Sequence, residues 1–290
     1  MPPTESTPSA EGALRLIQEL AQSLEAFALD PGDAATGPAQ GCPALRERDA
    51  LPSDLDPMNA YYQAGYLHEV SVDNVVAFTK QFHSPVPAIG PFVSVRAALE
   101  SSSIAAWLAD PSIAPRQRVA RSLAFRKEGV AQQRKLATTS RLIDTSGIER
   151  RIEQLDAHFA QLHASRDQGA SAELLTSRMP SATELVRDCL KKEADYRILS
   201  AVAHAHLWAL QQVSFRVVRD QEGPHLEKKL EPTVIVYLCM LAATSLVVPL
   251  RMMARQYGWK APIVQRTIDR MSRIADEPVR LSPAAGPLPA

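Results

Sequence analysis

The sequence predicts an all-α protein organised as a multi-helix bundle. Three observations predict this class: the chain is rich in Ala and Leu with only 6% aromatic residues, its apolar residues recur at helical spacing, and Ser-x-x-Glu capping boxes precede two apolar segments. No segment shows the alternation typical of a strand. We expect an N-terminal helical arm with a Pro/Gly-rich linker over 1–57, a bundle domain over 58–275 and a frayed, disordered tail over 276–290.

In the N-terminal half, helices are predicted at 11–28, 57–69, 72–81, 91–109 and 115–138. The first of them carries one apolar stripe that includes Leu14, Ile17 and Leu20. The dense Gly, Pro, Asp and Ala content of residues 30–57 indicates irregular chain. Pro115 can begin the last of these helices, because the first turn of a helix has no use for the N–H that proline lacks.

In the C-terminal half, helices are predicted from Ser146 onward and at 182–192, 194–218, 232–256 and 262–274, with a turn at 167–170. Ser146 with Glu149, and Ser181 with Glu184, have the spacing of capping boxes, in which each residue of the pair satisfies a backbone N–H of the other. Both boxes therefore mark helix starts.

The segment Pro232–Leu250 contains no charged residue and has about the minimum length of a membrane span. It also contains Thr, Ser, Cys and Pro, so we expect the central buried helix of a bundle, with a single membrane anchor as the alternative. Gly258 is expected to end this helix. The spacing of Ala254, Gly258 and Val264 fits either a helix-turn-helix or a Gly-capped helical hairpin.

Composition excludes several function classes. The formal net charge is zero, so no global field attracts nucleic acid or anionic membrane. The three cysteines have no zinc spacing, and we expect no metal and no cofactor. Residues 1–10 lack the basic and apolar regions of a signal peptide, and the odd number of cysteines fits a reducing compartment. A cytoplasmic location is therefore expected.

An arginine and a histidine, Arg197 and His204, lie on one face of the predicted helix 194–218. Similar spacings occur at two other places and are expected by chance: Arg151/His158 and Arg219/His225. Of the three pairs, only Arg197/His204 lies among apolar residues such as Leu199 and Val202. We therefore expect Arg197 and His204 to be partly enclosed, where polar groups are costly without partners.

The stretch Tyr196-Arg197-Ile198-Leu199-Ser200-x-x-x-His204 resembles the Arg-x(4–6)-His motif of the HEPN superfamily of helical prokaryotic proteins. It resembles more closely a branch of bacterial proteins with a Tyr-x-x-Leu-Ser-x-x-x-His motif. Arg96 and Glu100, followed by an apolar helix to Trp107, are similar to the Arg-x-x-x-Glu helix that precedes the motif in that branch. The two similar pieces cover 90–110 and 182–215.

This resemblance implies a helical bundle, often a homodimer, with the motif in a cleft between subunits. Active members are metal-independent ribonucleases, commonly toxins with an antitoxin partner or defence effectors. His204 would take the proton from a ribose 2′-OH, and Arg197 would hold the non-bridging phosphate oxygens. A second histidine, from the other subunit or His206, would protonate the leaving oxygen. The supporting residues would be Arg96, Glu100, Tyr196, Ser200 and His206.

The chain departs from active members at Ile198, because a polar residue usually follows the arginine there. The alternative is a non-catalytic protein-interaction or nucleic-acid-binding protein in which Arg197 and His204 are structural. In that case we expect Arg197 to pair inside the bundle with Glu100 or Glu193.

A basic segment provides a second candidate site. Residues 115–141 hold eight basic and one acidic side chain, whereas residues 1–73 hold twelve acidic and three basic ones. The residues proposed to contact nucleic acid are Arg116, Arg118, Arg121, Arg126 and Lys127. Such a run can follow a phosphate backbone, although almost no aromatic residue is present to stack on bases. The alternatives are a solvated helix face and docking on the acidic N-terminal third.

Overall fold

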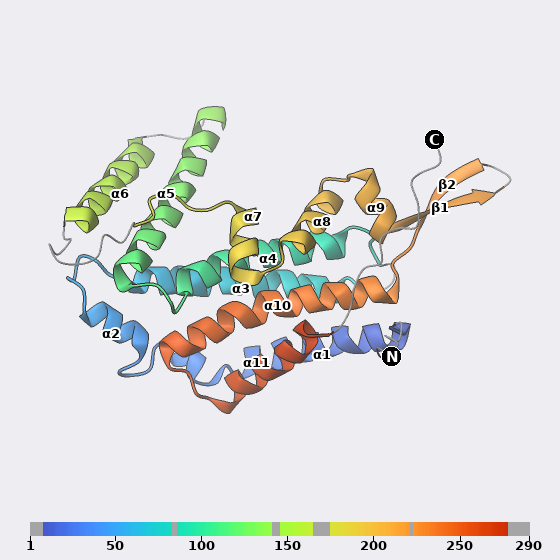
Figure 1. Ribbon diagram of the computed structural model, residues 1–290, viewed down its shortest axis with the longest axis horizontal. Coiled ribbons are helices and arrows are strands. Elements are labelled where there is room, and N and C mark those ends of the chain that lie inside the picture. The colour runs from blue at the N-terminus through green and yellow to red at the C-terminus, as the bar shows by residue number, and fades with distance from the viewer. Residues whose placement is uncertain (1–7, 83–85, 141–145, 165–174, 221–222, 278–290) are drawn as a thin grey trace, which may run out of the picture.

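The structure is a computed structural model that describes residues 8–82, 86–140, 146–164, 175–220 and 223–277. Within these ranges the chain is a multi-helix bundle with one two-stranded hairpin (Figure 1), which confirms the all-α prediction. The N-terminal half contains α1 (Ala10–Leu29), η1 (Gly32–Thr36), α2 (Pro43–Asp49), α3 (Met58–Lys80), α4 (Gly90–Ala109) and α5 (Pro115–Ser140). The C-terminal half contains α6 (Ser146–Ala164), α7 (Ala182–Leu185), η2 (Val186–Leu190), α8 (Glu193–Ala203), α9 (Leu207–Val213), β1 (Phe215–Asp220), β2 (Gly223–Lys228), α10 (Pro232–Tyr257) and α11 (Pro262–Ala275).

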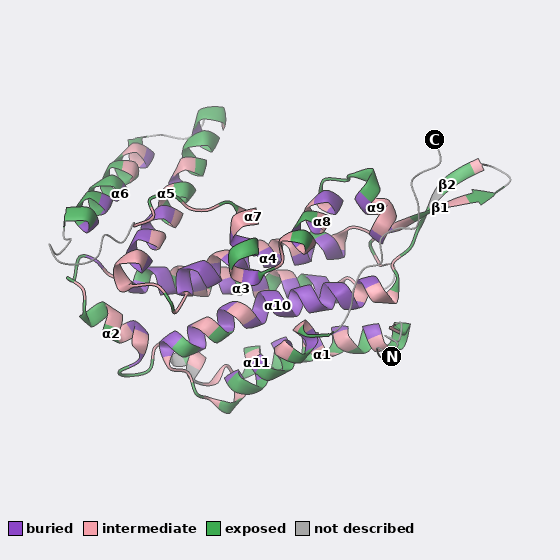
Figure 2. Cartoon of the chain, in the orientation of Figure 1, coloured by how far each residue is buried: buried purple, intermediate pink, exposed green. Residues whose placement is uncertain are grey.

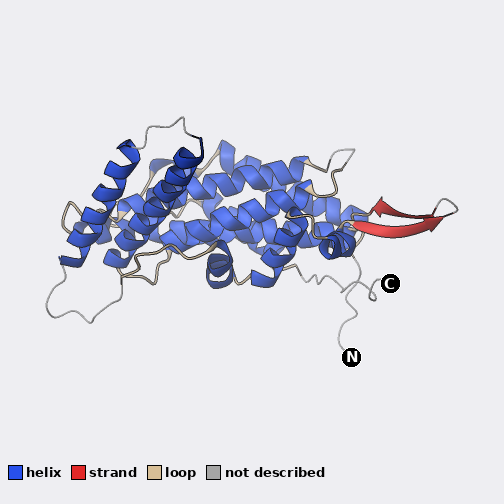
Figure 3. Ribbon diagram, turned by 90° about the horizontal axis from the view of Figure 1, so that it is seen from above, coloured by secondary structure: helices blue, strands red, loops and turns tan. Residues whose placement is uncertain are grey.

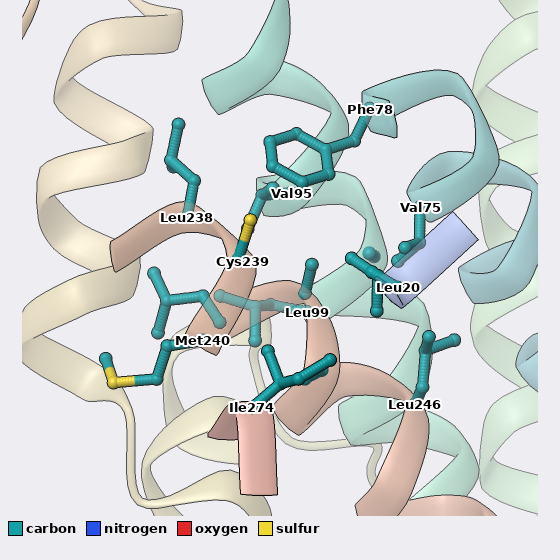
Figure 4. Packing of buried hydrophobic residues seen from close by; sticks show 14 of the residues in the cluster. Leu20, Val75, Phe78, Val95, Leu99, Leu238, Cys239, Met240, Leu246 and Ile274 are labelled. Atoms are coloured by element: carbon teal, nitrogen blue, oxygen red, sulfur yellow. The ribbon is translucent and has the colours of Figure 1, made fainter. Parts of the chain in front are cut away.

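The apolar helix α10 forms the centre of the bundle and packs against α1, α3, α4 and α11. Most of its length is buried, as the purple ribbon of Figure 2 shows. In Figure 4, Leu238 and Leu246 of α10 lie among residues of α3 and α4 such as Phe78 and Leu99. Among the described residues, α10 is the one helix long and apolar enough to cross a membrane, and 83% of its most apolar window is buried inside the protein. This burial fits the central helix of a bundle.

The N-terminal helix α1 is part of the bundle. Its buried residues share one core with the domain that we expected to begin only at residue 58. Ile17, Leu20 and Leu24 of α1 belong to the same buried cluster as α10. The apolar stripe of an amphipathic helix must be covered, and α10 and α11 cover this one. The tail expected at 276–290 lies, from residue 278 on, outside the described residues, as does the turn expected at 167–170.

The chain between 194 and 228 differs from the prediction of one helix over 194–218. The helix ends at Ala203, a short α9 follows, and residues 215–220 then pair antiparallel with residues 223–228. This hairpin extends from one end of the bundle (Figure 3). The expectation that no strand occurs was therefore wrong. The missed signal is the run Phe215-Arg216-Val217-Val218, which has the aromatic and β-branched composition of a strand.

Two helix boundaries confirm the capping arguments. Ser181 Oγ accepts a hydrogen bond from the N–H of Glu184 at 3.3 Å, and the N–H of Ser181 donates to Glu184 Oε2 at 2.7 Å, which completes a capping box. Gly258 ends α10 in the left-handed region at φ 70°. Helix α11 then folds back and buries Val264 and Ile268 in the main core, which is the geometry of the Gly-capped hairpin.

Candidate functional site

Arg197 and His204 are both exposed, so the expectation that they are partly enclosed was wrong. The Arg197 side chain is 67% exposed, and its Nε and Nη2 atoms donate to Glu193 Oε1 at 3.0 and 2.8 Å. Glu193 lies one turn earlier on the same helix and is one of the two partners expected for a structural Arg197. His204 lies at the exposed C-terminal end of α8.

The end of α8 explains why His204 is exposed. Ala205 adopts the left-handed conformation at φ 55°. The N–H of Ala205 donates to the Val202 carbonyl at 3.0 Å, and that of His206 donates to the Ala201 carbonyl at 2.9 Å. These two bonds form a Schellman motif, which normally has glycine at the left-handed position. Because alanine occupies it here, the sequence gives no sign of the break.

The residues after this break form a surface that we call the α8–α9 corner, residues 204–208. All five are exposed. The imidazoles of His204 and His206 lie 6.5 Å apart, centroid to centroid, at 77° to each other. Leu207 and Trp208 are 52% and 55% exposed. The corner thus combines two imidazoles with an uncovered apolar pair.

The supporting residues Arg96, Glu100 and Tyr196 come together in one cluster. Arg96 Nη2 lies 2.8 Å from Glu100 Oε1, and the Tyr196 hydroxyl donates to the same oxygen at 2.6 Å. The Arg96 guanidinium also lies 5.8 Å from the centroid of the Tyr196 ring. Burial, with the hydrogen bond to Glu100, raises the pKa of Tyr196. The two similar pieces of sequence are therefore in direct contact, and α8 is fixed to α4.

A second contact fixes α8 to the central helix. The Tyr237 hydroxyl of α10 donates to Asp195 Oδ1 at 2.8 Å. Tyr196 points into the bundle, whereas Arg197 points to solvent, and Ser200 is half-buried between these two faces. The exposed Arg197 therefore stands on a helix that two tyrosines hold from behind, and the α8–α9 corner follows the end of this helix. Such support limits the movement of groups on the exposed face.

The basic helix α5 does not present the expected phosphate-binding face. Arg118 is fully buried. Its Nε lies 2.7 Å from Glu47 Oε2, while Nη1 and Nη2 donate to the carbonyls of Leu108 and Asp110 at 2.7 and 2.8 Å. These carbonyls lie at the C-terminal end of α4, where a helix leaves acceptors without partners and favours positive charge.

The other basic residues of this set are also engaged, with one exception. Arg121 donates to the Trp107 carbonyl at 2.5 Å and lies 5.2 Å from the centroid of the Trp107 ring. Arg116 donates to the Leu162 carbonyl at 2.5 Å, and Lys127 pairs with Asp156 at 2.6 Å. Arg126 is exposed. The expected nucleic-acid face is therefore corrected for Arg118, and the alternative of docking on the acidic third holds at Glu47.

The structure also contains a cavity that was not predicted from the sequence. It has a volume of about 440 Å³ and is lined by residues of α1, η1, α3 and α10, including His68. The signal in the sequence is Tyr61-Tyr62 followed by Tyr66, an unusual concentration of rings on one helix. The described residues contain no group of three or more His, Cys, Asp or Glu side chains that could hold a metal ion.

The candidate site therefore has two parts: the Arg96–Glu100–Tyr196 cluster behind α8, and the exposed Arg197 with the α8–α9 corner in front. The first part joins residues of α4 and α8 that are about 100 residues apart in the chain, and the second part follows Tyr196 directly. Comparison of the chain with known protein families, curated proteins and solved structures gives no match.

Proposed function

We propose that the protein is a HEPN-like, metal-independent endoribonuclease whose RNA site is formed by Arg197 and the α8–α9 corner. The observation that carries this proposal is the joint exposure of Arg197 and His204 on a helix that is fixed from behind. The ion pair of Arg197 with Glu193 is no obstacle, because an exposed pair contributes only about 0–1 kcal/mol. A phosphate can therefore replace Glu193 as the partner of Arg197.

The proposed chemistry needs only these side chains. The neutral imidazole of His204 takes the proton of a ribose 2′-OH, and the freed oxygen attacks the adjacent phosphorus. A 2′,3′-cyclic phosphate forms, and the 5′-oxygen leaves with a proton from His206 or from a histidine of a second subunit. Arg197 binds the non-bridging oxygens bidentately and stabilises the charge that develops on them.

A homodimer is part of this proposal. Leu207 and Trp208 are exposed beside the two imidazoles, and tryptophan is strongly enriched at the centres of protein interfaces. A second copy that covers this pair would bring two sets of Arg197 and His204 together. A cytoplasmic toxin or defence role, with an antitoxin as partner, belongs to the same proposal.

The alternative is a non-catalytic interaction protein that uses the corner to bind another protein. Two observations favour it: Glu193 already holds Arg197 by two hydrogen bonds, and the half-buried Ile198 stands where active members carry a polar residue. In this case Leu207 and Trp208 bind the partner protein, and the imidazoles of His204 and His206 take no part in catalysis.

The experiment is RNA cleavage in the presence of EDTA. The wild-type protein should release fragments with 2′,3′-cyclic phosphate ends from total RNA. His204→Ala should lower the rate at least about 100-fold, the usual contribution of a general base. The matched control is His158→Ala, because His158 is also exposed and follows an arginine at the same spacing. This variant should cleave at the wild-type rate.

Two results would overturn the ribonuclease: no cleavage by the wild-type protein, or equal cleavage by the wild-type protein and His204→Ala. Light scattering tests the dimer separately. A dimer that Trp208→Ala converts to monomer supports the two-subunit site, whereas a monomeric wild type removes it. A dimer that cleaves no RNA would favour the interaction protein.

A further inference from the structure

A cavity of about 440 Å³ opens beside the C-terminal half of α10, among α1, η1 and α3. This volume lies within the range of about 300–1,000 Å³ that is usual for small-molecule sites. The β1–β2 hairpin and α9 precede the other end of α10 in the chain, so the cavity is separate from the α8–α9 corner. None of the residues of the proposed ribonuclease site lines it.

The back wall of the cavity is a fixed row of aromatic rings. The centroids of Tyr61 and Tyr257 are 5.5 Å apart, and those of Tyr257 and Trp259 are 5.0 Å apart. Trp259 Nε1 donates to the Gly37 carbonyl at 2.8 Å, and the Tyr61 hydroxyl donates to Glu47 at 3.0 Å. Since both ends of the row are hydrogen-bonded, the wall is preformed and a flat apolar molecule can pack against it without ordering it.

Tyrosines are concentrated at this cavity to an unusual degree. Four of the six tyrosines in the chain line it: Tyr61, Tyr62, Tyr66 and Tyr257. Tyr62 and Tyr66 lie one turn apart on α3 and are 55% and 76% exposed, so they form the rim. The edges and faces of aromatic rings favour other rings, so this rim suits an aromatic ligand.

His68 contributes a nearly buried imidazole to the wall of the cavity. The residue is 6% exposed, and its Nδ1 atom is buried with no hydrogen-bond partner in the part of the chain that the structure describes. Burial lowers the pKa of His68 to about 4, so the imidazole is neutral at pH 7. Buried side-chain nitrogens are nearly always hydrogen-bonded, so an imidazole without a full set of partners beside a cavity points to a group that the protein itself does not provide.

The charge of the lining restricts what can enter. Glu69 is the one carboxylate among the described lining residues, and no lysine or arginine is among them. An anion would have to leave water without a counter-charge, which is costly. The cavity therefore favours neutral or cationic molecules.

Gly65 keeps the cavity open from the side of α3. It lies in the interior of this helix, where glycine is a poor helix former. A Cβ atom at this position would meet no atom within 4 Å. A larger side chain here would therefore extend into the cavity and fill it, without a clash at its base.

We propose that this cavity binds a small, mainly aromatic molecule that carries a hydroxyl group and no negative charge. The apolar body packs against the rings of Tyr257 and Trp259 and against the rim formed by Tyr62 and Tyr66, and the hydroxyl group bonds to His68. A hydroxyl can donate or accept, so it suits either tautomer of the neutral imidazole.

The probe is 2-naphthol, which we would compare with naphthalene and 2-naphthalenesulfonate by equilibrium dialysis against the full-length protein. We expect 2-naphthol to bind about tenfold more tightly than naphthalene, the effect of one hydrogen bond. The sulfonate should not bind. No binding of 2-naphthol, equal binding of 2-naphthol and naphthalene, or preferred binding of the sulfonate would each overturn the proposal.

Variants locate the binding. Gly65→Leu should abolish binding of 2-naphthol, whereas Gly129→Leu should leave it unchanged. Gly129 is a matched control because it is also a helix-interior glycine, on α5, whose added Cβ would meet no atom within 4 Å. Retained binding in Gly65→Leu would place the ligand elsewhere and overturn the assignment.

His68 is tested in two ways. His68→Leu should weaken 2-naphthol about tenfold, to the affinity of naphthalene, and should leave naphthalene unchanged. The second test uses the wild-type protein and therefore does not depend on the folding of a variant. The imidazole ¹⁵N signals of His68 should shift when 2-naphthol is added and not with naphthalene. Unshifted signals at saturation would exclude the hydrogen bond.

Discussion

Two arginines in this protein differ in burial, and burial decides what each ion pair contributes. Arg118 is completely buried between Glu47 and the carbonyls at the end of α4. Arg197 pairs with Glu193 at nearly the same distance, but its side chain is 67% exposed. A buried charge that loses its partner is left uncompensated in a medium of low polarity, whereas an exposed one is solvated by water.

Removal of the two carboxylates should therefore have different effects. Glu47→Ala should lower the free energy of unfolding by about 3–5 kcal/mol, because it leaves the Arg118 guanidinium buried and unpaired. It also removes the acceptor of the Tyr61 hydroxyl. Glu193→Ala should cost less than about 1 kcal/mol. Urea unfolding measures both values, and similar losses in the two variants would contradict the assignment.

His68 predicts a pH dependence of stability. Its pKa in the folded protein is lowered to about 4, against 6.5 for an ordinary histidine. The unfolded chain therefore binds a proton that the folded chain does not, and stability falls as the pH falls from 6.5 toward 4. Near pH 5 the loss should be about 2 kcal/mol relative to pH 7. Urea unfolding at pH 7, 6 and 5 measures this change in the free energy of unfolding. In His68→Leu the contribution of His68 to the pH dependence should be absent.

At the scale of the element, the sequence predicts the end of α10 but not the end of α8. Gly258 marks the end of α10, because glycine readily adopts the left-handed conformation that a helix end requires. The end of α8 has the same requirement, but Ala205 fulfils it, so the prediction continued one helix as far as residue 218. The error moved His204 from an expected inner face to an exposed corner.

Exchanging alanine and glycine at Ala205 and Gly258 should change the stability of the protein in opposite directions. Ala205→Gly should stabilise the protein by about 1 kcal/mol, because it removes the strain of alanine at φ 55°. Gly258→Ala should destabilise it by at least about 1 kcal/mol. The added Cβ would also lie 3.2 Å from the Cβ of Cys42. Thermal or urea unfolding of both variants checks the prediction. A loss of stability in Ala205→Gly would mean that the left-handed turn is not retained.

The sequence predicted which residues belong to the candidate site, but it did not predict how they are arranged in space. The sequence pointed to Arg96, Glu100 and Tyr196 as separate pieces, and packing of α8 on α4 joins them by one carboxylate oxygen. It also allowed Glu193 as the partner of Arg197. The sequence allowed the basic helix to dock on the acidic N-terminal third, but it did not indicate that Arg118 would be buried against Glu47, which lies about 70 residues away in the chain. Long-range contacts of this kind leave no local pattern.

At the scale of the whole molecule, the packing is uneven. Helices α1, α3, α4, α10 and α11 share one core around α10. Helix α6 packs chiefly on α5, and the two extend from one end of the bundle (Figures 1 and 3). The buried residues of α6, such as Leu155 and Phe159, belong to a second cluster. A segment that rests on a single neighbour can open without the rest of the chain.

Hydrogen exchange should therefore show two levels of protection. Amides of α10 should exchange only when the whole protein unfolds, whereas those of α6 should exchange faster, by local opening. Phe159→Ala removes a buried ring that is 8% exposed and faces α5, so it should raise exchange in α6 and the second half of α5 more than tenfold. Rates in α10 should stay at the wild-type value. An equal rise in α10 would show that α5 and α6 unfold together with the main core, and that the second cluster has no stability of its own.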